Sequence, residues 1–122
     1  MVQLKLQITR PSFEAILRGE QKIESREVKP RNASRYVVEK ELPDGSIEVT
    51  PKHIDALYLI NGRRKDAPRL TVEVLGAEWW VHSDDDGNDI TFEENGETFL
   101  WSEVWYHLGR ILATENCERY NV

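Results

Sequence analysis

Two turn signals, each placed between short β-prone runs, constrain this chain to a largely antiparallel β fold. Asp44-Gly45 and Asn95-Gly96 are both flanked by residues rich in β-branched and aromatic side chains. An Asp-Gly or Asn-Gly pair in this setting is a strong signal for a tight hairpin, because both residue types tolerate the positive φ that the turn needs. The sequence therefore predicts one hairpin over residues 36–50 and another over residues 90–101.

The rest of the chain adds further strands and one helix. Residues 4–8 alternate apolar and polar side chains, which indicates a strand with one buried face. Pro11 suits a first helical turn, and Gly19 is placed to end a helix whose apolar residues recur at helical spacing. Further strands are expected over 22–29, 54–60, 70–80 and 104–113, with loops over 32–34 and 84–89. Strands dominate and their turns favour antiparallel neighbours, so we expect a β-dominated α+β fold, a small mixed β-barrel with one or two short helices beside it.

Length and composition fit one globular domain. The chain has 122 residues, of which 39% are hydrophobic and 31% charged. These values are ordinary for a single soluble domain. The single cysteine, Cys117, excludes an internal disulfide framework, and His53, His82 and His107 lack the spacing of metal ligands. With no apolar run long enough for a membrane span or a signal peptide, we expect a cytoplasmic domain over 1–122 without a metal or other cofactor.

Charge is distributed unevenly along the chain, whose formal net charge is −6. Residues 70–122 are strongly acidic, whereas residues 22–69 carry an excess of basic side chains. The overall balance disfavours broad binding of duplex nucleic acid through its phosphates. Two basic groups lie in loops after separate strands, where they could converge to bind phosphate or simply remain solvated. They are Arg26, Lys29, Arg31 and Arg35, and then Arg63, Arg64, Lys65 and Arg69.

The segment from residue 13 to residue 30 is the most informative for function. Glu24 and Arg26 lie two residues apart on a predicted strand, so their side chains share one face. A carboxylate and a guanidinium held side by side can orient the polar edge of a ligand, with Arg26 donating and Glu24 accepting. The same spacing also suits a structural ion pair at the rim of a barrel.

This segment carries an ordered set of apolar, glycine and charged positions: Phe13, Ile16, Leu17, Gly19, Lys22, Ile23, Glu24 and Arg26. The pattern resembles the signature of the ASCH domain (activating signal cointegrator homology), a family of PUA-like β-barrels. The resemblance extends more weakly to Leu4–Ile8 and Leu108–Leu112. It implies a cleft between the helix-to-strand loop and the barrel, where members of the family are suspected of binding RNA or nucleotides.

Some small members of that family are amidohydrolases acting on N4-acetylcytidine, in which a lysine after the loop glycine works with a threonine and a glutamate. Here Gln21 stands at the usual lysine position, Lys22 follows it, and Glu24 occupies the threonine position. Gln21 cannot act as a base or nucleophile, and a shift of one residue on a strand sends Lys22 to the opposite face. The leading prediction is therefore an RNA- or nucleotide-binding module with its cleft at residues 19–29. The alternatives are an amidohydrolase with Lys22 and Glu24 as catalytic residues, and a protein-interaction module using the acidic C-terminal face.

Aromatic side chains add candidates for ligand stacking, because exposed aromatics beside a basic groove stack on bases. Trp79 and Trp80 are adjacent on a predicted strand and point to opposite faces, so at least one is expected in the core and the other is available to stack. Trp101 and Trp105 are expected to fill the core. The partner expected is RNA or a small nucleotide or nucleoside, with no membrane. The expected ligand-binding residues are Gly19, Gln21, Lys22, Glu24, Arg26, Lys29, Arg31, Arg63, Arg64, Trp79 and Trp80.

Overall fold

The computed structural model describes residues 1–118 and residue 120, and the chain divides into two compact units. The first unit comprises 1–24, 53–76 and the described residues from 106 onward, and the second comprises 25–52 and 77–105. Three strands contribute residues to both units: β2 (Ile23–Val28), β6 (Arg69–Val81) and β9 (Ser102–Glu115).

The first unit is built on β1 (Gln3–Gln7) and β5 (Ala56–Ile60), together with its parts of β6 and β9. The strand β1 pairs in parallel with β5, and β5 pairs antiparallel with β6. Leu4 and Leu6 are buried and alternate with exposed polar residues of β1, as the sequence predicted. By contrast, β5 is almost entirely buried, which explains its continuous apolar sequence.

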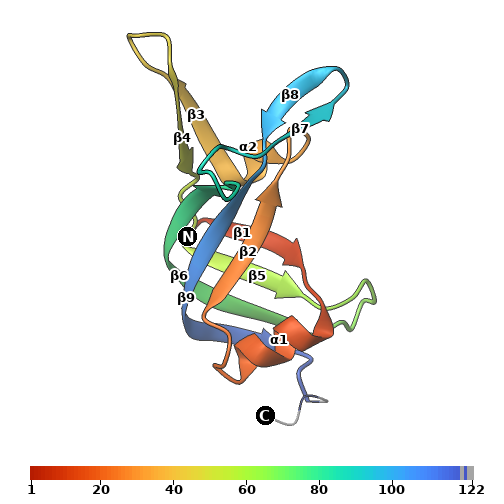
Figure 1. Cartoon of the computed structure of the whole chain (residues 1–122). Coiled ribbons are helices and arrows are strands. Elements are labelled where there is room, and N and C mark those ends of the chain that lie inside the picture. The colour runs from red at the N-terminus through yellow and green to blue at the C-terminus, as the bar shows by residue number, and fades with distance from the viewer. Residues whose placement is uncertain (119, 121–122) are drawn as a thin grey trace. The chain divides into compact units, whose positions relative to one another are not determined.

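The helix α1 (Arg10–Leu17) follows β1 directly and leads back into β2 (Figure 1). Its apolar side is anchored by Phe13 and Ile16, both of which are buried. The chain turns out of the helix at Gly19, whose φ of +77° lies in the left-handed region that glycine adopts without strain. The predicted helix, its end and the strand after it are therefore confirmed.

The second unit contains both predicted hairpins, which Figure 1 shows as separate two-stranded arms. One pairs β3 (Val37–Glu41) with β4 (Ile47–Pro51), and the other pairs β7 (Thr91–Glu94) with β8 (Glu97–Leu100). Asn95 at φ 53° and Gly96 at φ 81° supply the two positive φ angles of the second turn.

One local prediction is wrong, because residues 32–34 do not form a simple loop. The short helix α2 (Ala33–Tyr36) begins directly after Asn32, whose Oδ1 accepts a hydrogen bond from the Lys29 backbone N–H at 2.8 Å. Tyr36, expected to start a strand, instead ends this helix and is buried. Burial of the Tyr36 ring favours this single helical turn. Four residues are too few for a hydrophobic periodicity that would predict a helix from the sequence.

Strands dominate the two short helices, which confirms the β-dominated α+β class. The largest sheet has the order β1-β5-β6-β9-β2, and the two hairpins form sheets of their own. Within the described residues this order leaves β1 and β2 as edges, so a closed barrel is not shown.

The hairpin turn at Gly96 gives a first testable prediction. We expect Gly96→Ala to lower the free energy of unfolding by about 1–2 kcal/mol, because an alanine pays a steric penalty in the left-handed region. A Cβ at this position would meet no atom within 4 Å, so the effect is confined to the backbone. Urea denaturation measures the change.

Gly76→Ala is the matched control, since Gly76 also has open space around a Cβ but no positive φ. In a strand such a replacement stabilises by roughly 0.5–1 kcal/mol. Equal destabilisation by the two alanines would contradict the backbone explanation.

Candidate functional site

The connection from α1 to β2 lines a pocket of about 640 Å³ in the first unit. Gly19, Gln21 and Lys22, three of the residues predicted to bind a ligand, lie on its wall. The pocket also takes residues from the end of α1, from β6 and from β9, and its surface is mainly apolar. The remaining lining residues are Ile16, Leu17, Arg18, Val72, Glu73, Leu75, Leu108, Gly109, Arg110 and Ile111.

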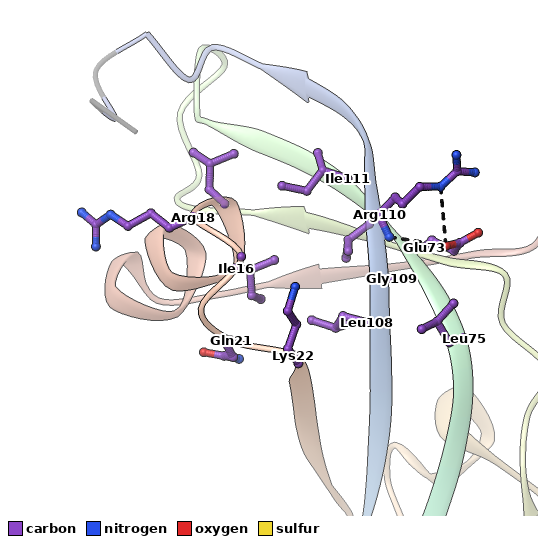
Figure 2. Close-up of a pocket in the computed structure, with 13 residues that line it drawn as sticks. Ile16, Arg18, Gln21, Lys22, Glu73, Leu75, Leu108, Gly109, Arg110 and Ile111 are labelled. Atoms are coloured by element: carbon purple, nitrogen blue, oxygen red, sulfur yellow. Dashed lines mark hydrogen bonds and ion pairs between the residues drawn. The ribbon is translucent and has the colours of Figure 1, made fainter.

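Lys22 is the cation best placed to meet a ligand in this pocket. Figure 2 shows its side chain extending from the start of β2 between Ile16 and Leu108, whereas Arg18 and Arg110 are directed away from it. The Lys22 carbonyl accepts a hydrogen bond from the Leu108 backbone N–H at 2.9 Å, which fixes the base of the side chain against β9. The ammonium nitrogen lies 3.7 Å from where a Cβ on Gly19 would stand.

Gln21 and Lys22 both line the pocket, contrary to the expectation that neighbouring residues face opposite ways. The reason is that both precede β2, so strand alternation begins only at Ile23. The Gln21 side chain is used locally, since its Nε2 donates to the Ile23 carbonyl at 2.9 Å. Lys22, and not Gln21, therefore provides the positive charge on this wall of the pocket.

The opposite wall includes two polar residues that the sequence analysis did not name as ligand-binding, Glu73 and Arg110. The Glu73 Oε1 accepts a hydrogen bond from the Arg110 backbone N–H at 3.4 Å and lies 3.9 Å from the Arg110 Nε. Gly109 allows this approach, because a Cβ there would collide with the Glu73 carboxylate and stand 2.9 Å from Leu75. A glycine within an apolar strand was the available signal, although register between distant strands is not readable from sequence.

Glu24 and Arg26 are arranged as strand periodicity predicted, but neither lines this pocket. Glu24 is buried with 8% of its surface exposed, and Arg26 is half-buried on the same face of β2. Glu24 belongs to the first unit and Arg26 to the second. Of the two residues proposed for catalysis, Lys22 lines the pocket and Glu24 does not.

The predicted basic loops are partly engaged in local ion pairs. Lys29 lies 3.7 Å from a Glu27 carboxylate oxygen, and Arg64 lies 3.4 Å from Asp66. Arg31 and Arg63 are exposed. The loop after β2 belongs to the second unit and the loop after β5 to the first, so convergence of the two groups stays a prediction.

The aromatic side chains separate into a half-buried and an exposed set. Trp79 is half-buried and lines a different cavity, whereas Trp80 is 48% exposed and packs on Trp105 with ring centroids 5.6 Å apart. The core placement predicted for Trp101 is wrong, because that side chain is 40% exposed. Trp101 lies just after β8, and its ring packs on that of His82 with ring centroids 4.7 Å apart.

Three other features were assessed over the described residues: a reactive thiol, a metal site and a membrane-spanning helix. Burial raises the pKa of the Cys117 thiol, which reduces the thiolate needed for nucleophilic catalysis. Across residues 1–118 and 120, no group of three or more His, Cys, Asp or Glu side chains could hold a metal ion. Over the same residues, no helix has the length and apolar character needed to span a membrane.

Comparison with known proteins identifies no relative: no protein-family model, curated protein or solved structure matches this chain. The resemblance to the ASCH domain therefore rests on the residues that carry it.

Proposed function

We propose that this chain is an ASCH-type, PUA-like module that binds RNA or a nucleotide in the pocket beside the α1–β2 loop. One observation carries the proposal: the Lys22 side chain extends into a mainly apolar pocket at the loop where the resemblance implies a cleft. A nucleotide combines a flat, largely apolar base with an anionic phosphate. Such a ligand matches apolar walls that meet a single inward-directed ammonium group.

The dimensions and charge of the pocket favour a small contact rather than an extended one. Its volume of about 640 Å³ falls within the range of small-molecule sites. Leu75, Leu108 and Ile111 offer apolar surface to a base, while Lys22 can donate to a phosphate or carbonyl oxygen. The net charge of −6 also favours a ligand held by few phosphate contacts over a long nucleic acid.

The barrel arrangement of the family is part of the same proposal, as is a cytoplasmic location. The mixed sheet, with its parallel β1–β5 pair, supports the arrangement, and so does a helix placed directly between the first two strands. The hydrolase alternative is less favoured, because Glu24 lies outside the pocket that Lys22 lines.

Salt dependence tests the proposed phosphate contact. Each phosphate contact with a single strand contributes a slope of about −0.7 in log affinity against log salt, so one or two contacts predict a fall of roughly three- to sevenfold between about 50 and 200 mM salt. Fluorescence anisotropy with short labelled RNA oligomers, and calorimetry with nucleoside monophosphates, measure this slope. The matching nucleosides are the control, since without a phosphate their affinity should change little. Phosphorylated ligands with salt-independent affinity would contradict the proposal.

A further inference from the structure

The outward face of β9 in the second unit carries aromatic side chains that the pocket beside Lys22 does not use. Along this stretch Ser102 and Val104 are buried. The residues that alternate with them are exposed or half-buried: Trp101, Glu103 and Trp105. Because alternate residues of a strand share one face, two indoles and a carboxylate stand together on the solvent side.

Trp80 and His82, at the end of β6, complete an aromatic cluster with these three residues. The Trp80 ring packs on that of Trp105, with centroids 5.6 Å apart. The His82 ring packs on that of Trp101 at 4.7 Å between centroids. The Glu103 carboxylate accepts a hydrogen bond from the Trp105 Nε1–H and lies 3.1 Å from the His82 Nε2. The rings are therefore held in place, yet 48% of Trp80 and 40% of Trp101 stay exposed, as in surfaces that bind a partner.

The segment 77–105, which supplies the whole cluster, contains no lysine or arginine. Its acidic turn over 84–89 begins and ends beside the cluster, since Ser83 pairs with Asp89 in an isolated bridge. Directly after this turn, the Ile90 N–H donates to the His82 carbonyl at 2.8 Å. The acidic residues of the segment are Glu78, Asp84, Asp85, Asp86, Asp89, Glu93, Glu94, Glu97 and Glu103.

This charge selects the kind of partner. The cations of the second unit belong to 25–52, where Lys29 lies 3.7 Å from a Glu27 carboxylate oxygen and Arg35 lies over the Tyr36 ring. The acidic turn beside the cluster would repel the phosphates of a nucleic acid and attract a positively charged partner.

We propose that the aromatic cluster binds an arginine-bearing basic segment of a partner protein. A guanidinium stacks flat on an exposed indole, and tryptophan is the ring that makes this contact best. The acidic turn attracts the other positive charges of the segment and accelerates the encounter. The proposal is independent of nucleotide binding at Lys22, because no residue of the cluster lines that pocket.

A labelled peptide in which arginine and serine alternate tests the proposal, and fluorescence anisotropy at low salt measures its affinity. The matched peptide carries citrulline, which has nearly the shape of arginine but no charge. We expect the citrulline peptide to bind at least about tenfold more weakly to the intact chain, since contacts with two indoles alone account for about 4- to 25-fold. Equal binding of the two peptides to the wild type would overturn the proposal without recourse to any variant.

Variants locate the contact. Trp80→Ala and Trp101→Ala should each weaken binding of the arginine peptide about two- to fivefold, the range for an exposed cation–π contact. Val38→Ala is the control, since Val38 is 50% exposed on β3 of the same unit and lies outside the cluster. Affinity unchanged in both tryptophan variants, or lowered equally by Val38→Ala, would overturn the proposal. So would a short RNA oligomer that binds more weakly to Trp80→Ala, because the indole would then stack on a base.

Discussion

Phe13→Ala is expected to lower the free energy of unfolding by about 3–5 kcal/mol, the usual loss when a fully buried phenyl ring is removed. Phe13 is 0% exposed and packs against Tyr120 with ring centroids 5.1 Å apart. The same ring anchors α1, which carries the chain into the turn at Gly19 and on to Lys22. Urea denaturation followed by tryptophan fluorescence and far-UV circular dichroism measures the loss.

Phe92→Ala is the matched control in the second unit. Phe92 is only half-buried, and its ring packs against that of Phe99 across the hairpin with ring centroids 5.9 Å apart. Loss of this aromatic pair should lower the free energy of unfolding by only about 0.5–1.5 kcal/mol, in addition to the effect of the smaller buried area. An equal loss in both variants would contradict the assignment of Phe13 to the core.

The same pair of variants tests the prediction of one domain. Phe13 belongs to the first unit and Phe92 to the second. If the chain unfolds as one cooperative domain, both substitutions shift a single transition that all probes report together. Two transitions, each shifted by only one of the variants, would show that the units unfold separately.

The sequence predicts the elements of this fold well where the deciding interactions are local. The turn at Gly96 and the helix end at Gly19 both depend on a positive φ, and glycine is the residue type that indicates such a φ in a sequence. The helix α2 escapes prediction because burial of Tyr36, a tertiary contact, holds its single turn. The exposure of Trp101 escapes it for the same reason, since apolar character alone does not show which rings the core accommodates.

The candidate site follows the same division between local and distant residues. One wall of the pocket, with Gly19, Gln21 and Lys22, is contiguous in the chain and was predicted as a group. The other wall, with Glu73 and Arg110, comes from two strands whose register is set by the fold as a whole. The sequence could not show whether Lys22, one residue after the position expected for a lysine, faces the pocket. The answer depends on where β2 begins, which the fold as a whole determines.

Lys22→Ala is the variant with the largest expected effect on ligand binding. We expect it to weaken binding of a nucleoside monophosphate by about 1–3 kcal/mol, or roughly 5- to 150-fold, since a hydrogen bond from a charged group is lost. Lys22→Met should weaken binding to a similar degree, because it keeps the length of the side chain but not the charge. Lys40→Ala is the control, as Lys40 is an exposed lysine of β3 outside the pocket. Calorimetry measures the affinities, and a loss shared by Lys40→Ala would contradict the role of Lys22.

The same variant decides between a binding module and a hydrolase. A lysine acts as a base only when it is neutral, so hydrolysis would require an environment that removes the proton of the ammonium group. The Gln21 side chain donates a hydrogen bond to the Ile23 carbonyl, and Glu24 is not among the residues that line the pocket, which disfavours the hydrolase alternative. We therefore expect no measurable hydrolysis of N4-acetylcytidine by the wild type. Robust turnover that disappears in Lys22→Ala would overturn the binding-module proposal, and it would mean that Lys22 acts as the base with a partner other than Glu24; Glu73 is the carboxylate among the residues that line the pocket.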